Sequence, residues 1–258
     1  MHRIRVIPVV LIDNERVVKT RQFRAAQYIG DPINTVKLFS DKEADEIAIL
    51  DIGASRNSSK PDLERIYDCV GEATMPVSYG GGITALGQIG EILARGVEKV
   101  VMNSSAIRDP GLIEAAARRF GSSSIVVSVD YQRGWLGQAM VFDHVARSRT
   151  KYHLLDFVRR AENLGAGEIL LNCVDRDGMF TGYDIDTIRC VTDAVSIPVV
   201  ACGGASRLAD FHEAVVRGGA SAVAAGSLFV LQGPHRAVLI SYPTQDVLER
   251  EIYSRIGE

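Results

Sequence analysis

Short apolar segments alternate with longer amphipathic segments along the whole chain. The apolar segments are residues 6–11, 46–51, 76–79, 99–102, 125–130, 169–173, 198–201 and 222–225. Segments that are apolar on both faces are typical of a parallel sheet covered by helices. Eight such units in 258 residues predict an α/β fold, a (β/α)8 TIM barrel that residues 1–258 form as one domain.

Composition narrows the class of protein. The chain is 47% hydrophobic and 24% charged, which allows a large core and excludes a disordered or collagen-like chain. A net charge of −3 gives no overall attraction for nucleic acid or for an anionic membrane. No apolar run reaches the roughly 18 residues of a membrane helix, and residues 1–5 lack a secretory segment. We therefore expect a cytoplasmic protein with neither nucleic acid nor membrane as a partner.

The sequence predicts neither a metal site nor a cofactor. The cysteines Cys69, Cys173, Cys190 and Cys202 form no Cys-x-x-Cys pair, and three of them lie in apolar segments, so we expect free structural thiols. No Gly-x-Gly-x-x-Gly motif follows the first strand, which argues against the alternative of an open dinucleotide-binding sheet.

The chain repeats weakly at half its length. Residues 79–84 match residues 201–206 at an offset of 122, and residues 100–104 match residues 223–227 at an offset of 123. Two matches in the same order predict a barrel built from two similar halves.

Glycines and hydroxyl residues after the strands predict two phosphate sites at the barrel mouth. Glycine lets backbone N–H groups approach an anion closely. The first site would use Gly82, Asn103 and Ser104. The second would use Asp177, Gly178, Gly203, Gly204, Gly226 and Ser227. A ligand with a phosphate at each end would span the mouth; the alternative is that these glycines only make tight turns.

Asp130 is the strongest candidate for proton transfer. It ends an apolar strand at the carboxyl rim of the barrel, where acid and base groups of such enzymes lie. Asp51, Asp175 and Asp177 also follow strands. For Asp130, and more so for Asp51, the alternative is a carboxylate that only caps a neighbouring loop.

Several motifs together carry a family resemblance over nearly the entire chain. They are Arg16-Val17-Val18-Lys19, Asp51-Ile52 with Ala54-Ser55, Gly80 to Ile83, Asn103, Asp130, Gly165 to Glu168, Asp175 to Gly178 and Gly203-Gly204. With them the sequence resembles the cyclase subunit of imidazole glycerol phosphate synthase. The resemblance implies a half-symmetric barrel that receives ammonia from a glutaminase subunit on its N-terminal face. It also implies two catalytic aspartates that convert a two-phosphate substrate to imidazole glycerol phosphate and an aminoimidazole carboxamide ribotide.

One of those two aspartates is missing. With Arg5 and the segment 16–19 fixing the alignment, the family's aspartate at the end of the first strand corresponds to Leu11. An aliphatic side chain cannot transfer a proton. Asp13 lies two residues further and is a possible substitute, although it would stand about 6 to 7 Å further along the strand.

A second departure lies near the end of the chain, at residues 233–243. This segment resembles cyclase paralogues encoded with surface-polysaccharide genes. The resemblance implies amidination of a nucleotide sugar, in which a glutaminase makes ammonia, the barrel conducts it and a third, sugar-modifying protein uses it. The alternative is an additional loop without such a role.

Charged residues at the opposite end of the barrel match the family's ammonia gate. They are Arg5, Glu46, Lys99 and Glu168, and they precede or begin four different strands. Four charges at the bottom of an apolar barrel must pair to offset desolvation, so we expect a closed ring of salt bridges. The alternative is that the ring only stabilises the barrel floor.

A basic first loop completes the set of candidate residues. Lys19 and its basic neighbours Arg16, Arg21 and Arg24 are suited to closing over an anionic ligand, such as a phosphorylated molecule or a nucleotide sugar. A merely solvated loop is the alternative. The sequence thus favours the barrel subunit of a glutamine-dependent ammonia-transfer complex for a surface sugar. The competing hypothesis is the histidine-pathway cyclase with an altered catalytic pair.

Overall fold

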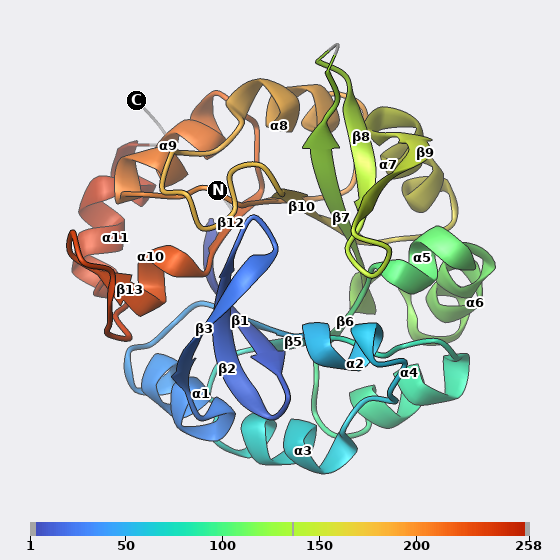
Figure 1. Cartoon of the computed structure of the whole chain (residues 1–258), viewed down its shortest axis with the longest axis horizontal. Coiled ribbons are helices and arrows are strands. Elements are labelled where there is room, and N and C mark those ends of the chain that lie inside the picture. The colour runs from blue at the N-terminus through green and yellow to red at the C-terminus, as the bar shows by residue number, and fades with distance from the viewer. Residues whose placement is uncertain (1–3, 136, 256–258) are drawn as a thin grey trace.

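Eight parallel strands close into a barrel in the computed structural model, which describes residues 4–135 and 137–255. The barrel strands are β1 (Arg5–Asp13), β4 (Ile47–Asp51), β5 (Val77–Gly80), β6 (Lys99–Met102), β7 (Ile125–Arg133), β10 (Glu168–Cys173), β11 (Val199–Cys202) and β12 (Ala222–Ala225). Each pairs with the next, and β12 closes the ring on β1 with Arg5 beside Ala222 (Figure 1). The predicted (β/α)8 barrel and its eight strands are confirmed.

Helices cover the outside of this ring. They are α1 (Pro32–Asp41), α3 (Leu63–Gly71), α4 (Leu86–Leu93), α6 (Gly111–Phe120), α7 (Leu154–Asn163), α8 (Ile185–Thr192), α9 (Leu208–Val216) and α11 (Gln245–Glu251). Aspartate caps define two of their starts: Asp31 and Asp62 accept hydrogen bonds from the backbone N–H groups of Asn34 and Arg65. Within the described residues no helix is long and apolar enough to cross a membrane.

Side chains of the barrel strands divide between two cores. In β1, Ile7, Val9 and Leu11 point into the barrel, whereas the alternate residues Val6 and Val10 pack in the core shared with the helices. This alternation follows from the two-residue period of a strand. The barrel interior is therefore filled by small and medium apolar side chains.

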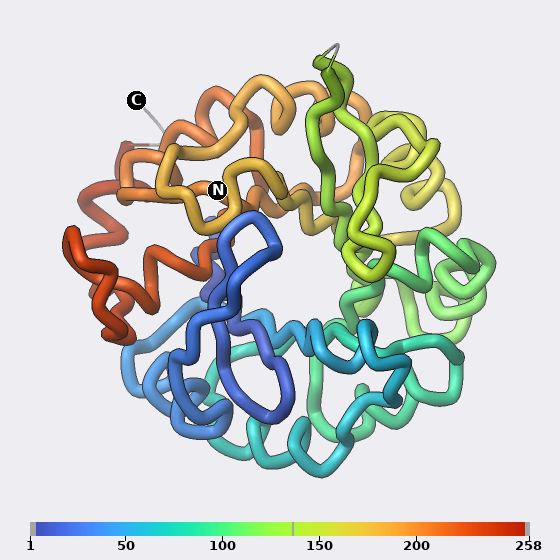
Figure 2. The backbone as a smooth tube through the Cα atoms, viewed as in Figure 1, coloured from blue at the N-terminus to red at the C-terminus, as the bar shows by residue number. Residues whose placement is uncertain are grey.

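Two antiparallel hairpins rise from the mouth, and the sequence analysis did not predict them. β2 (Arg16–Arg21) and β3 (Arg24–Gly30) continue from β1, and β8 (Ala139–Asp143) and β9 (Ser148–His153) continue from β7. They form because β1 and β7 are nine residues long and extend beyond their barrel neighbours. The expected basic first loop is thus a hairpin, which reaches across the mouth (Figure 2).

Short helices follow three of the barrel strands. They are α2 (Ile52–Arg56), α5 (Ser104–Arg108) and α10 (Ser227–Val230). Ser104 and Ser227, which the half-repeat aligns, begin α5 after β6 and α10 after β12. These are the fourth and eighth strands around the barrel, so the repeat of the sequence is a repeat of the structure.

Residues 233–243 pack against the barrel. A short hairpin pairs β13 (Leu231–Gln232) with β14 (Ala237–Val238), so the first part of this segment forms its turn and second strand. Tyr242 follows the hairpin. The Tyr242 ring lies 5.3 Å from the ring of Phe229, and its hydroxyl donates to the carbonyl of Val6 at 2.9 Å. The segment therefore has a structural role at the first barrel strand.

We expect Tyr242→Phe to lower the free energy of unfolding by about 1 kcal/mol, because it leaves the buried Val6 carbonyl without this donor. Tyr242→Ala should cost about 3 to 5 kcal/mol, because it also empties the space beside Phe229. Denaturant unfolding monitored by circular dichroism measures both changes. Equal stability of the Ala variant and the wild type would show that the segment is not anchored by this ring.

Candidate functional site

A cavity of about 840 Å³ occupies the barrel mouth. Its wall combines strand ends from both halves of the barrel with the two hairpins and α2. Leu11, Asp13, Lys19, Asp130 and Asp177 all line it. The structure thus brings most candidates for proton transfer and ligand binding to one place.

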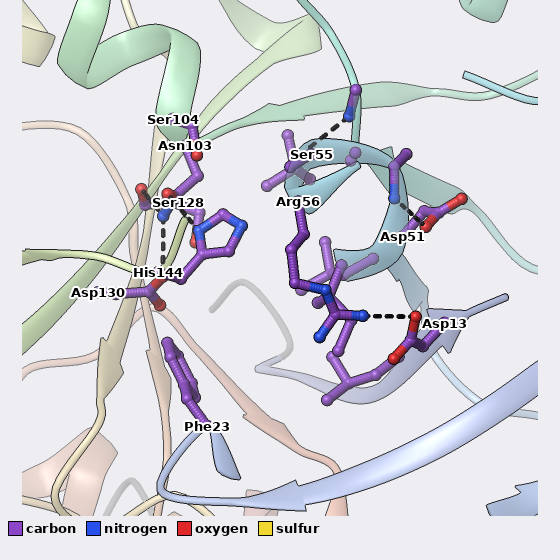
Figure 3. Close-up of a pocket in the computed structure, with 18 of the residues that line it drawn as sticks. Asp13, Phe23, Asp51, Ser55, Arg56, Asn103, Ser104, Ser128, Asp130 and His144 are labelled. Carbon is purple, nitrogen blue, oxygen red and sulfur yellow. Dashed lines mark hydrogen bonds and ion pairs between the residues drawn. The ribbon is translucent and has the colours of Figure 1, made fainter. Parts of the chain in front are cut away.

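Asp130 lies buried at the floor of this cavity. Its two carboxylate oxygens accept hydrogen bonds from the side-chain amides of Asn172 and Asn103, each at 3.0 Å. Asn103 also donates to the Ser128 carbonyl at 3.0 Å, so its side chain positions Asp130 (Figure 3). The predicted phosphate ligand Asn103 therefore has its amide group committed to the carboxylate.

Burial raises the pKa of Asp130 from 3.8 to about 7. The amides of Asn172 and Asn103 lower the pKa, whereas the negative charges of Asp177 and Asp143 raise it further. A carboxyl group with a pKa near neutral pH is suited to act as an acid or a base.

His144 approaches the same group from the β8–β9 hairpin and was missed in the sequence analysis. Its Nδ1 lies 3.1 Å from the Asn103 Oδ1, whose amide donors already point to Asp130 and Ser128. Nδ1 therefore carries the proton in this network. Burial lowers the pKa of His144, against the opposing charge of Asp143, which favours a neutral ring. No sequence motif marks it, because only the hairpin fold brings it to Asn103.

Leu11 and Asp13 differ in their surroundings. Leu11 packs within the apolar interior of the barrel and is 9% exposed. Asp13 stands beyond it at the end of β1, with its Oδ1 2.6 Å from the guanidinium of Arg56 (Figure 3). Asp13 reaches the cavity as expected, but as the partner of a cation that the sequence analysis did not identify.

Asp51 caps the start of a helix, in line with the alternative that this carboxylate only caps a neighbouring segment. Its Oδ1 accepts a hydrogen bond from the Ala54 backbone N–H at 2.8 Å, at the start of α2. Burial raises the pKa of Asp51, whereas this hydrogen bond lowers it. Asp175 accepts a hydrogen bond from the Arg133 backbone N–H at 2.9 Å and so supports the base of a hairpin.

The first predicted phosphate site is open to the cavity. Gly82 and Ser104 both line the cavity, and the Ser104 Oγ is buried without a hydrogen-bond partner among the described residues. Gly82 has φ +67°, and a side chain there would meet the Ser59 carbonyl oxygen at 2.4 Å. Only glycine fits this turn.

The second predicted phosphate site is covered. Of its glycines and serine only Gly226 lines the cavity; Gly178, Gly203, Gly204 and Ser227 do not. The Lys19 Nζ, from the β2–β3 hairpin, bonds both carboxylate oxygens of Asp177 at 2.8 and 3.0 Å. The carbonyl of Thr20 lies against Gly178. The two halves that look alike in sequence are therefore unlike at the mouth.

The four gate candidates form a closed ring at the opposite end of the barrel. Arg5 pairs with Glu46 and, at 2.7 Å, with Glu168, while the Lys99 Nζ lies 3.2 and 3.3 Å from the same two carboxylates. Ser78 adds a hydrogen bond to Glu46 at 2.7 Å. Burial alone would raise the pKa of Glu46, but Arg5 and Lys99 hold it below its usual value. The expected ring geometry is present.

We expect the free energy of unfolding to fall by about 2 to 3 kcal/mol between about pH 5 and about pH 8 because of Asp130. A carboxyl group with a raised pKa binds more protons in the folded chain, so its contribution is lost as the pH rises through about 7. Denaturant unfolding of the wild type and of Asp130→Asn at both pH values isolates this contribution. An identical pH dependence of the two proteins would contradict it.

Comparisons with known proteins agree with this architecture. A family model described as a histidine biosynthesis protein matches residues 5–234. A Pseudomonas aeruginosa protein, provisionally named imidazole glycerol phosphate synthase subunit hisF2, is 45% identical over 249 residues, which cover 96% of this chain and 99% of the relative. The imidazole glycerol phosphate synthase subunit HisF of Alkaliphilus metalliredigens is 39% identical over 225 residues, or 87% of this chain and 89% of the relative. The chain therefore belongs to the histidine biosynthesis protein family, among its HisF cyclase subunits.

Proposed function

We propose that this chain is the barrel subunit of a glutamine-dependent ammonia-transfer complex that conducts ammonia for amidination of a surface-polysaccharide nucleotide sugar. The observation that carries the proposal is the contrast between the two ends of the barrel. The charged ring of Arg5, Glu46, Lys99 and Glu168 is complete, whereas Leu11 occupies the place of one proton-transferring aspartate at the mouth. A glutaminase would bind the N-terminal face, and a third, sugar-modifying protein would take the ammonia.

The apolar character of the barrel interior favours a neutral molecule over an ion. The inner core consists of apolar side chains and includes Ile7, Val9, Val101, Val126 and Leu170. Leu11 extends this lining to the mouth. Uncharged ammonia can pass such a lining, whereas an ammonium ion would lose its hydration without compensation.

The ring supports controlled entry into this interior. The side chain of Lys99 is 12% exposed, and both of its carboxylate partners are also bonded by Arg5. Rotation of Lys99 away from the ring would leave each carboxylate with a cationic partner. The desolvation cost of opening is therefore smaller than for an isolated buried ion pair.

A second candidate function is the histidine-pathway cyclase with an altered catalytic pair. The observation that favours it is that Asp13 and Asp130 face the same cavity. The ion pair of Asp13 with Arg56 opposes it, because the guanidinium occupies one of the carboxylate oxygens that would have to transfer the proton. A cytoplasmic location, which the sequence predicts, is compatible with both candidates. Met1, His2 and Arg3, which belong to the segment on which that prediction depends, lie outside the described residues.

With ammonium salts and the ribotide substrate of histidine synthesis, we expect turnover about 10² to 10⁴ times slower than that of a member with both aspartates, because Leu11 removes one proton-transfer group. A steady-state assay against such a member measures the ratio. Equal turnover, abolished by Asp13→Asn, would instead establish Asp13 as the substitute and the chain as a cyclase.

In the complex with the glutaminase and the sugar-modifying protein, we expect glutamine-dependent product to survive Asp130→Asn and to fall, with ammonia released to solvent, in Lys99→Met. Lys99→Met should also lower stability, by less than the about 3 to 5 kcal/mol expected for breaking an isolated buried ion pair, because Arg5 still pairs with both carboxylates. Product and released ammonia are therefore measured per amount of folded protein.

Lys37→Met serves as the matched control, because Lys37 has an exposed ion pair with Glu72 on the helical surface. It removes the same charge and should change neither product nor ammonia release. Loss of product in Asp130→Asn together with normal transfer in Lys99→Met would show that the barrel is a synthase and would refute the conduit.

A further inference from the structure

The turn between β7 and β8 carries the only tryptophan of the chain. Trp135 is fully exposed, and the tip of its hairpin stands out beyond the ring of helices (Figure 1). Tryptophan side chains are highly buried on average, and in protein interfaces they are among the residues whose loss weakens binding most. Neither the barrel core nor the mouth cavity uses this side chain.

The hairpin presents Trp135 from a firm base. The Gly134 N–H donates to the Gln138 carbonyl at 2.7 Å and closes the turn around the tryptophan. At the foot of the turn, the Arg133 guanidinium bonds both carboxylate oxygens of Asp184 at 2.8 and 3.0 Å. A preorganised hairpin loses less conformational freedom when a partner binds to it.

The outer strand β9 places basic side chains beside this turn. Arg149, Lys151 and His153 are exposed and alternate with half-buried residues, as expected for a strand with one covered face. The Arg149 guanidinium donates to the Arg133 carbonyl at 3.3 Å, which places it next to the turn that carries the tryptophan. An exposed aromatic ring and exposed cations therefore belong to one surface.

This surface is cationic although the chain is acidic overall. Residues 134–153 contain three lysines and arginines and one carboxylate, whereas the whole chain has a net charge of −3. The carboxylate, Asp143, accepts hydrogen bonds from two backbone N–H groups of its own turn. Within the part of the chain that the structure describes, no carboxylate pairs with Arg147, Arg149 or Lys151. The free charge is complementary to an acidic protein surface.

The same surface adjoins the mouth cavity. The turn between β8 and β9 reaches inward over the mouth, and His144 and Arg147 of this turn line the cavity (Figure 2). β9 is the last strand in its part of the sheet, so its outer edge pairs with no described strand. A protein bound to β9 and Trp135 therefore lies at the mouth, at the end of the barrel opposite the charged ring.

We propose that this surface, formed by Trp135, Arg147, Arg149 and Lys151, is the docking site for an acidic face of the sugar-modifying protein. Trp135 is the apolar anchor of the contact, and the three cations steer and orient the partner. Docking there covers the mouth, so that ammonia leaving the barrel meets its acceptor before it meets solvent. The inference deepens the proposed function and rests on it for the identity of the partner.

Fluorine NMR of the full chain labelled with 5-fluorotryptophan tests the proposal, because Trp135 gives the only tryptophan signal. We expect this signal to shift when the purified sugar-modifying protein is added, since the ring passes from water into an interface. Addition of the glutaminase, which is proposed to bind the opposite face, should leave the signal unchanged. An unshifted signal in a complex that calorimetry shows to be formed would overturn the proposal.

Trp135→Ala and Tyr67→Ala are a matched pair, because each removes an exposed aromatic ring. Tyr67 lies on α3, on the other side of the barrel from the β7–β8 hairpin (Figure 1). We expect Trp135→Ala to weaken binding of the sugar-modifying protein at least about tenfold, and Tyr67→Ala to change it less than about twofold. Isothermal titration calorimetry measures both, and circular dichroism confirms that the variants are folded.

Arg149→Glu/Lys151→Glu tests the contribution of charge. We expect this variant to weaken binding at least about tenfold and to reduce the dependence of affinity on salt, because repulsion replaces attraction. Lys37→Glu/Lys42→Glu reverses the same number of charges at α1 and should leave the affinity within about twofold. Unchanged affinity of the first variant would show that the cations only protect the edge of β9, and would overturn the proposal.

The failure of the inference and the failure of the proposed function give different results. No binding of the sugar-modifying protein, or normal binding to Trp135→Ala, would refute the docking site. A complex that transfers glutamine-derived ammonia while Trp135→Ala binds normally would refute the inference alone. A complex that docks through Trp135 but transfers no ammonia would refute the proposed function alone.

Discussion

Closure of β12 against β1 is the constraint on which the rest of the structure depends. Parallel pairing around the full ring leaves no free sheet edge, and it forces alternate residues of every strand into the interior. The inner core, the charged floor and the floor of the mouth are consequences of that alternation. The same alternation points the Asp130 side chain of β7 into the barrel, because Asp130 lies an even number of residues after the inward-facing Val126.

The strands and the barrel could be predicted because their signal is local. Each barrel strand is a short apolar run, and the paired glycine segments at half the chain length marked the two-fold architecture. The hairpins β2–β3 and β8–β9 could not be predicted in the same way. Their outer strands, β3 and β9, are largely exposed, and the hairpins form because β1 and β7 extend past the rim, which depends on the assembled barrel.

The candidate site was predicted in part for the same reason. Asp130 lies within a barrel strand and the gate residues begin or directly precede barrel strands, so the strand order places them, whereas Lys19 was expected in a loop and lies in β2. His144 and Arg56 come from elements that meet only in the folded chain, and no spacing in the sequence connects them with Asn103 or Asp13. The half-repeat also suggested two equal anion sites, whereas the hairpin that carries Lys19 covers only one of them.

The two ends of the barrel thus have different chemical properties. The floor is charged and fully paired, the interior is apolar, and the mouth holds the buried carboxylate of Asp130. Such a sequence of environments suits the proposed path of a small neutral molecule from the floor to the mouth. The loss of an acidic residue at Leu11 is consistent with passage and unfavourable for a two-aspartate reaction.

The most direct test of this account follows nitrogen through the complex. The complex is supplied with glutamine labelled with ¹⁵N in its side-chain amide, in the presence of a large excess of unlabelled ammonium, and the product is analysed by mass spectrometry. Conduction through the barrel predicts product that carries the glutamine label despite the excess. Product labelled only in proportion to the ammonium in solution would contradict the account.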